Sequence, residues 1–526
     1  MKSKIILVSI IILRFLLLDG STDNYLVPDE ALQLPFPDKA ILSENQQKLA
    51  SELLLLTESS NLADDFRFDN IIQSLSAQNT LRQTRSGLSV YVYIYFRQHQ
   101  KHTQAENFCE EITDHGPDFV VAWVKVDQLL SLASLPEVRT IRVVTPPEFY
   151  TGSVTTEGDI VHQTAYVRNN YNSKGRGIKI GVITDGVDSR VSAQASGDLP
   201  YDGYGLTVLS NIHGGDEGTA LLEIIHDMTP QAELFFHDSG FNTVDFTDAI
   251  SALISSGCNI ICDDVGWITE PFFEDGYVAQ YISEILSSRE DLIFVTSAGN
   301  AGESHYQGFF YPNPSAPSQH DFSQGQGGPF YIYLDMPEGS SIRVVLQWFD
   351  AFGGSGNDYD LYLVHTGTGT TVTGSVYVQD GDDDPLEFMM YMADATYNGE
   401  FVVIVNKYYG DPCLLELFLY PVGVTINQQY MSPTDAIFGH AAASGVISVA
   451  ATHYTTPYVP ETFSSQGPST KYDWSSRPFS EALNSLDVSS CDGVRITGAG
   501  GFGYNYPPGS DNWWFYGTSA SSPHTA

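Results

Sequence analysis

The chain has 526 residues, a length typical of about three domains. Hydrophobic residues make up 42% of it and charged residues 17%, as in ordinary globular proteins. It carries 24 basic and 64 acidic residues, and the net charge of −40 makes nucleic acids and anionic membranes poor partners. The excess of carboxylates predicts a solvated acidic surface. The alternative is a protein that functions in mildly acidic surroundings, where part of this charge is titrated.

Residues 1–21 are typical of a secretory signal peptide. Met-Lys-Ser-Lys precedes a short apolar run that ends at Gly20 and Ser21. Arg14 interrupts the run, so a membrane-spanning helix is not expected, and no later segment reaches the length of one. We expect a protein that is secreted or held in an acidic secretory compartment, with no membrane contact after signal removal. A secreted chain can pair its cysteines, and which of the five pair is left open.

Residues 22–86 are mixed and polar apart from a helical stretch around QQKLASELLLL, and they are interpreted as a spacer or pro-region. Residues 88–150 then follow the order strand, helix, strand, helix, strand. The segments are LSVYVYIYF, TQAENFCEEI, FVVAWVKV, QLLSLASL and VRTIRVV. This order predicts a small α+β domain.

Residues 160–315 contain strands that are apolar on both faces, such as IKIGVIT, AELFFHD and LIFVTSAGN, alternating with helical segments. This pattern predicts an α/β fold with a parallel sheet covered by helices on both sides. Residues 320–425 contain closely spaced strands without helices, which is typical of a β-sandwich and indicates an inserted domain. The α/β pattern resumes over residues 428–526 with HAAASGVISVAAT.

The segment YGTSASSPHTA ends the chain. It resembles the nucleophile motif of the subtilisin family, with Ser519 as the nucleophile. A serine at a helix N-terminus presents its hydroxyl and its own backbone N–H to a developing oxyanion. In that family the helix is long and central, whereas here it ends at Ala526, so we expect the sequence to be a fragment or a truncated product.

Two further motifs occur in the order that the subtilisin family requires. IKIGVITDGVD resembles its strand-to-aspartate motif, and Asp185 matches the triad acid with a slip of one residue. The alternative for Asp185 is a helix or turn cap. VTSAGNAG resembles the oxyanion segment, with Asn300 as the side-chain donor.

The general base departs from the subtilisin pattern. Glu217-Gly218-Thr219 stands where that family has His-Gly-Thr, and a glutamate base is found in the related sedolisins. The second acid that sedolisins carry four residues later is Leu221 here. The chain therefore resembles a hybrid of the two groups. Burial and repulsion from Asp185 would raise the pKa of Glu217, so a proton-sharing carboxyl pair and an optimum at about pH 4–6 are expected.

Other acids and histidines compete for the role of base. His213 lies in the loop before Glu217, and His226 lies roughly two and a half turns after it. His213 stays open as a rival base, whereas His226 is expected to be structural. Glu223 and Asp227 have the i, i+4 spacing of a sedolisin acid pair but are expected on a solvated helix face.

CNIICDDVGW aligns with the strand that binds substrate backbone in subtilisins. Gly266 would permit the close approach of a peptide added as an extra strand. Asp263 and Asp264 are expected to cap the chain or to enter a solvent network. The alternative is that they favour basic or polar substrate side chains.

GSGNDYDLYL and QDGDDDPLE lie in the predicted sandwich. The first resembles the pre-peptidase C-terminal domains of secreted proteases. Clustered carboxylates suit Ca²⁺, and plain acidic turns are the alternative. We expect no required cofactor, and a structural Ca²⁺ remains an open hypothesis.

The resemblance implies a secreted serine endopeptidase that hydrolyses protein or peptide substrates. Asp185, Glu217, Asn300 and Ser519 would form its site, and residues 88–150 would be a propeptide and thus an early partner. The alternative is a catalytically inactive, protease-like scaffold that acts as a secreted binding or adhesion protein.

Overall fold

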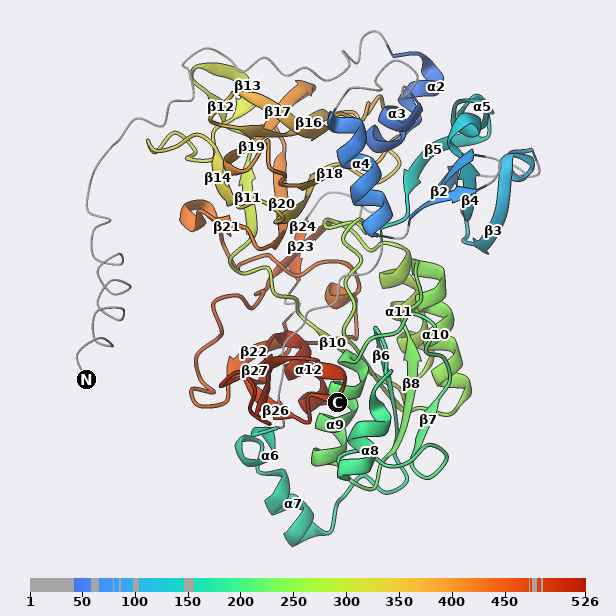
Figure 1. Cartoon of the computed structure of the whole chain (residues 1–526), viewed down its shortest axis with the longest axis vertical. Coiled ribbons are helices and arrows are strands. Elements are labelled where there is room, and N and C mark those ends of the chain that lie inside the picture. The colour runs from blue at the N-terminus through green and yellow to red at the C-terminus, as the bar shows by residue number, and fades with distance from the viewer. Residues whose placement is uncertain are drawn as a thin grey trace.

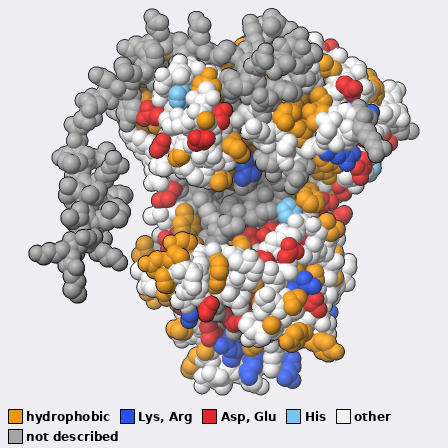
Figure 2. Space-filling model, viewed as in Figure 1, with side chains coloured by type: hydrophobic (Ala, Val, Ile, Leu, Met, Phe, Trp, Pro, Cys, Tyr) orange, Lys and Arg blue, Asp and Glu red, His pale blue; other side chains and the backbone are white. Residues whose placement is uncertain are grey.

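The computed structural model describes residues 42–57, 66–78, 80–84, 87–97, 104–145, 156–472, 474, 480–483 and 486–526. The predicted signal peptide lies outside these residues. Among the described helices none is long and apolar enough to cross a membrane. Acidic side chains are scattered over the face shown in Figure 2 rather than gathered into one patch.

A parallel sheet forms the core of the half of the molecule that contains the C-terminus (Figure 1). Its seven strands run in the order β25-β22-β10-β9-β6-β8-β7. Their bounds are Val488–Asp492, Ile447–His453, Ile293–Ser297, Ile260–Asp263, Lys179–Thr184, Glu233–Asp238 and Leu206–Val208. Every neighbouring pair is parallel, which confirms the α/β prediction from the doubly apolar strands.

Helices cover both faces of this sheet. On one face α9 (Glu217–Met228) and α12 (Thr518–Thr525) pack over a core that includes Val182, Leu221 and Ala520. On the other face α10 (Thr243–Ser255) and α11 (Tyr277–Ser288) enclose a second core. Successive residues of a strand point to opposite faces, so a central strand contributes side chains to both cores. Smaller elements complete this half: α6 Gly158–Val161, α7 Thr164–Tyr171, α8 Arg190–Ser196, β23 Ser469–Tyr472, β24 Ser480–Leu483, β26 Val494–Ile496, β27 Tyr504–Asn505 and β28 Trp513–Phe515.

Two antiparallel sheets lie between the two stretches that build the parallel sheet. One contains β11 (His305–Phe309), β20 (Leu414–Val422), β15 (Ser341–Trp348) and β18 (Leu386–Met392). The other contains β12 Pro312–Asn313, β13 Ala316–His320, β14 Ile332–Met336, β16 Asp358–His365, β17 Thr370–Ser375, β19 Gly399–Tyr409 and β21 Thr425–Ile426. The sheets share a core that includes Trp348, Tyr359 and Phe401. The strands begin at His305, before the predicted start at 320, because β11 to β13 are short and interrupted by prolines.

A third antiparallel sheet is built mostly from residues predicted to form an α+β domain, and its first strand lies in the predicted spacer. Its strands are β1 Leu81–Thr84, β2 Gly87–Phe96, β3 Cys109–His115, β4 Phe119–Lys125 and β5 Val138–Val143. Helix α5 (Leu129–Ala133) is where a helix was expected. The helix predicted over TQAENFCEEI is wrong, since only Ala105–Phe108 form a 3-10 turn before β3 begins. Register shifts against β4 break the alternation in β3, so its sequence lacks a clean strand pattern.

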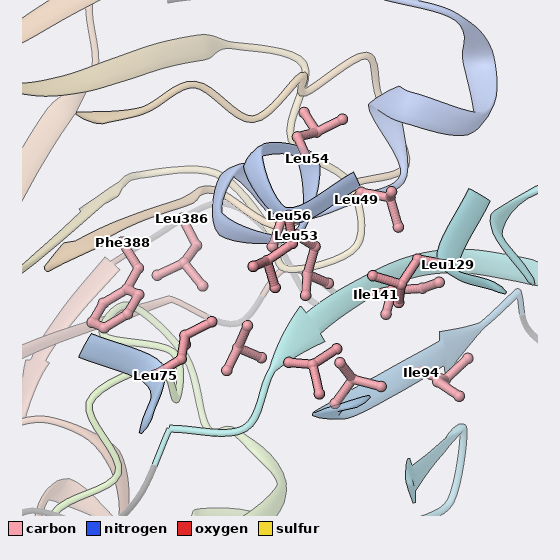
Figure 3. Close-up of a cluster of buried hydrophobic side chains, with 14 of the residues drawn as sticks. Leu49, Leu53, Leu54, Leu56, Leu75, Ile94, Leu129, Ile141, Leu386 and Phe388 are labelled. Atoms are coloured by element: carbon pink, nitrogen blue, oxygen red, sulfur yellow. The ribbon is translucent and has the colours of Figure 1, made fainter. Parts of the chain in front are cut away.

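The N-terminal helices belong to a shared core. Helices α2 (Glu44–Gln47), α3 (Ser51–Thr57) and α4 (Phe66–Ala77) precede the third sheet. Figure 3 shows Leu53, Leu56 and Leu75 of these helices packed with Ile141 of β5 and Phe388 of β18. The same cluster includes Ile268 and Phe272, which follow β9. The helix predicted around QQKLASELLLL is confirmed by α3, and its leucines are buried against other parts of the chain.

Candidate active site

Three neighbouring strands of the parallel sheet end in one row of polar side chains. Asp263 of β9 is level with Ile183 of β6 and with Thr296 of β10. The next residues, Thr184, Asp264 and Ser297, therefore stand side by side at the carboxyl edge of the sheet. Helices α9 and α12 begin at this edge with Glu217 and with Thr518-Ser519. The carboxyl ends of parallel strands are where α/β proteins build their sites.

Glu217 is fully buried in this row. Its Oε2 accepts a hydrogen bond of 3.1 Å from Thr184 Oγ1, while Oε1 is buried without a hydrogen-bond donor among the described residues. Burial holds the pKa of Glu217 well above its usual range, and the charges of Asp264 and then Asp185 raise it further. A group of this kind holds its proton in mild acid and suits acid–base chemistry.

Asp185 lies at the start of α9 and acts as its cap. Its Oδ1 accepts hydrogen bonds from the backbone N–H of Glu217 at 3.0 Å and of Gly218 at 3.2 Å, and also from Gly186. Burial raises the pKa of Asp185 to about 6, although these hydrogen bonds lower it. The cap, which was the alternative interpretation, is thus what the carboxylate does here, and its charge still acts on Glu217.

Asp264 is the acidic residue that the sequence interpretation missed. It is fully buried, so the solvent-network prediction is wrong for it. Burial raises the pKa of Asp264 to about 7; hydrogen bonding by Ser297, Ser519 and Glu217 lowers it, and the charge of Asp263 raises it. In the described structure neither oxygen of Asp264 completes a hydrogen bond of good geometry. Two ionised carboxylates offer no proton to each other, whereas a single shared proton would satisfy Asp264 and Glu217 together.

Ser519 and Asn300 flank one position at the start of α12. Asn300 Oδ1 accepts from the backbone N–H of Thr518 at 3.0 Å and from Thr518 Oγ1 at 3.1 Å, which leaves the Nδ2 amide as the donor on the other side. A methyl group placed on Gly517 would lie 3.2 Å from Asn300 Nδ2 and 3.3 Å from Ser519 Oγ. A carbon atom there would be in tight contact with both groups, and Ser519 itself is fully buried. A position flanked by a nucleophile and an amide donor is the arrangement that acyl transfer needs.

Asp263 and Gly266 line the other side of β9. His440 Nε2 lies 2.9 Å from Asp263 Oδ2, and both side chains are buried, so Asp263 is not in a solvent network. The same oxygen accepts the backbone N–H of Val265 at 3.3 Å, which confirms the capping prediction. A small pocket of about 20 Å³ is lined by residues that include Gly266, Ser297 and His440. Because Ser297 belongs to the row of polar side chains at the edge of the sheet, this pocket adjoins that row.

The rival bases His213 and His226 have other surroundings. His213 donates its backbone N–H to Asp238 Oδ2 at 2.7 Å, and its ring packs on Phe241 with centroids 4.8 Å apart. Burial lowers the pKa of both His213 and His226. The solvated-face prediction is wrong for Glu223, which is buried and accepts from Thr497 N–H at 2.8 Å and Thr497 Oγ1 at 2.6 Å.

The predicted calcium segments differ from each other. Asp358 and Asp360 of GSGNDYDLYL are buried within β16. In QDGDDDPLE, carboxylate oxygens of Asp380, Asp382 and Asp383 lie within 4.8 Å of one another. Arg97 already pairs with Asp382, which weakens the attraction for a cation. Calcium binding stays a prediction. All five cysteines are described, and none is paired.

Comparisons with known proteins find only weak similarity, and only to solved structures. No protein-family model and no curated protein matches the chain. The Clostridium perfringens CspB protease is 15% identical over 70% of this chain and 84% of its own, with a TM-score of 0.45. The prenylagaramide maturation protease PagA is 13% identical over 68% and 76%, with a TM-score of 0.32. MycP1 from Mycobacterium smegmatis is 11% identical over 72% and 77%, with a TM-score of 0.28. These scores are too low to assign a function, which is therefore inferred from the site.

Proposed function

We propose that the protein is a serine endopeptidase of the subtilisin/sedolisin type that works in mild acid. Ser519 attacks the peptide carbonyl, and a carboxylate of the buried acidic row, with Glu217 as its sequence-predicted member, takes the serine proton. Asn300 Nδ2 and the Ser519 N–H hold the oxyanion. The observation that carries this proposal is the position next to Gly517, which Ser519 Oγ and Asn300 Nδ2 both flank.

Acid activity is part of this proposal. Burial raises the pKa values of Glu217, Asp264 and Asp185. A carboxyl pair with raised pKa values keeps a proton in mild acid, where an isolated carboxylate on the surface has already lost it. The one-proton form of such a pair combines a base with a donor, so we expect a bell-shaped pH profile with a mildly acidic optimum.

The amino-terminal signal pattern supports a secreted protein, and the sheet of β1 to β5 supports a propeptide-like domain over α10. Tyr93 Oη accepts the N–H of Thr243 at 3.3 Å, and Asn242 Nδ2 donates to Asp114 at 3.0 Å. These contacts hold the sheet on the N-terminus of a helix in the catalytic half. The strands from His305 to Ile426 fit the proposed inserted β-sandwich.

A fluorophosphonate probe tests the proposed function. The full chain should be labelled between pH 4 and 6, and Ser519→Ala should abolish the label. If the wild-type chain is not labelled at any pH from 3 to 8, the peptidase proposal fails and the non-catalytic scaffold is favoured.

A further inference from the structure

We propose that Asp264, and not Glu217, is the carboxylate that receives the Ser519 proton, and that Glu217 is its proton-sharing partner. This inference rests on the proposed peptidase function and assigns a catalytic role to a residue that the sequence analysis placed in the substrate-binding strand. It also accounts for Leu221, which takes the place of the second acid on α9.

The strand register places Asp264 beneath Ser519. Cys262 Sγ lies 3.7 Å from Ser522 Oγ, so α12 crosses this face of β9. Asp264 is two residues beyond Cys262 and therefore points to the same face. Ser519 is three residues before Ser522 and hence on the same side of the helix, about 4.5 Å closer to its N-terminus. Moving from Cys262 to Asp264 and from Ser522 to Ser519 leads in both cases toward the carboxyl edge of the sheet. The side chains of Asp264 and Ser519 therefore lie near each other.

The contacts of the three carboxyl groups separate their roles. Ser519 and Glu217 both lower the pKa of Asp264, although neither oxygen of Asp264 completes a hydrogen bond of good geometry. Glu217 has Oε2 engaged by Thr184 and is acted on by Asp264 and Asp185. Asp185 has Oδ1 engaged by the first turn of α9. Asp264 is therefore the acid placed nearest the nucleophile by the strand register, Glu217 is the next, and Asp185 acts on Glu217 through its charge.

The proton steps balance within this pair. Before attack the pair holds one proton, on Glu217, and Asp264 is ionised. As Ser519 Oγ bonds to the substrate carbonyl carbon, its proton moves to Asp264, and the negative charge moves to the carbonyl oxygen. Asp264 then gives this proton to the leaving nitrogen as the C–N bond breaks. Water repeats the cycle on the acyl-enzyme.

The neighbouring charges are nearly all acidic. The charge of Asp185, at the end of β6, raises the pKa of Glu217. The charge of Asp263, on β9, raises the pKa of Asp264. Asp263 is itself paired with His440 on the opposite face of β9. Glu217 is protonated when Asp264 first ionises, and its hydrogen bond lowers the pKa of Asp264. A glutamine at 217 keeps a neutral hydrogen-bond donor there but has no proton to lose at higher pH.

The experiment compares Asp264→Asn with Glu217→Gln in the full chain, using the rate of fluorophosphonate labelling from pH 3 to 8. Asp264→Asn should lower the rate at least about 10³-fold at every pH, since general-base loss costs up to about 10⁴-fold. Glu217→Gln should keep measurable labelling, leave the acid limb within about one pH unit of the wild type, and lose the alkaline limb, because the second proton of the pair is no longer there to lose. Glu223→Gln is the matched control, because it changes a buried glutamate on the same helix away from Ser519.

The outcomes separate this inference from the proposed function. If Glu217→Gln abolishes labelling while Asp264→Asn only shifts the profile, the roles are the reverse of those proposed and the peptidase stands. If both variants match the wild type, the acid pair has no part in catalysis. Circular dichroism checks folding, and if Asp264→Asn does not fold, the Glu217→Gln profile decides: loss of all labelling there overturns the inference. Absence of labelling in the wild type overturns the proposed function itself.

Discussion

The side-chain oxygen of Asn300 accepts two hydrogen bonds from Thr518, the residue before the candidate nucleophile. This contact joins the end of β10 to the start of α12. It also fixes which end of the amide faces the site, because the oxygen is already used. These two hydrogen bonds therefore position the first residue of α12 and orient the Nδ2 donor of Asn300 toward Ser519.

Replacing Asn300 by Asp tests this donor. An aspartate keeps the oxygen that accepts from Thr518 but replaces the Nδ2 donor by a second oxygen. We expect kcat to fall by about 10²–10³ with little change in KM, as for other oxyanion-hole donors. The loss should be smaller at pH 4 than at pH 7, since a protonated carboxyl donates. Equal kcat in the variant and the wild type would remove Asn300 from the site.

Replacing Gly517 by Ala tests the space between Asn300 and Ser519. Gly517 has a φ of 110°, and the added methyl would occupy the position proposed for the substrate carbonyl. We expect the labelling rate to fall at least about 10²-fold, since the oxyanion contacts are blocked. Gly509→Ala is the matched control, because Gly509 also has a positive φ of 81° but has no atom within 4 Å of the added carbon. It adds a methyl group at another positive φ without blocking the site and should keep its labelling rate.

Replacing Thr184 by Val tests the hydrogen bond to Glu217. The Thr184 hydroxyl lowers the pKa of Glu217, so its removal should raise that pKa. A hydrogen bond to a charged group contributes about 1.5 kcal/mol or more, so the pH profile should move up by about one unit. Thr184→Ser keeps the hydroxyl and should keep the profile. A profile that stays in place in Thr184→Val would show that Glu217 does not set it.

Glu223 gives a prediction about stability. Burial raises the pKa of Glu223 to about 8 in the folded protein, above its value in the unfolded chain. Between these two pKa values the folded state binds more protons, so this contribution to stability is complete at low pH and is lost as the pH rises toward 8. Asp492 and Asp227, each with its pKa raised to about 7, act in the same direction.

We therefore expect a higher Tm at pH 5 than at pH 8, measured by calorimetry at constant ionic strength. Glu223→Gln should reduce this difference, because an amide does not titrate. A Tm that rises from pH 5 to pH 8 would contradict the burial of these carboxyl groups.

The sequence was most informative where a strand or helix carries its own pattern. The doubly apolar strands predicted the parallel sheet, and the glycine and serine pattern placed Ser519 at a helix start. Asp264 was missed because its neighbours come from α9, β10 and α12, and such contacts leave no local pattern. An Asp-Asp pair directly after an apolar strand was nevertheless a usable signal, since one of the two side chains must face each side of the sheet.

Long-range packing also explains the errors outside the site. Glu223 lies on a regular helical face that looks solvated until Thr497 covers it. The leucines of α3 were recognised as part of a helix, but their packing partners on β5 and β18 were not, because those strands are far away in the sequence.

The leucines of α3 and α4 limit what cleavage of the chain could achieve. They pack against Phe388 of one antiparallel sheet and Ile141 of another. Ion pairs such as Arg139–Asp384, at 3.0 Å, also join the amino-terminal residues to the later strands. A cut between residues 145 and 156 would sever the backbone without uncoupling these layers. The amino-terminal piece would then stay in place as a tightly held, non-covalent subunit, and the severed protein would still migrate as one particle.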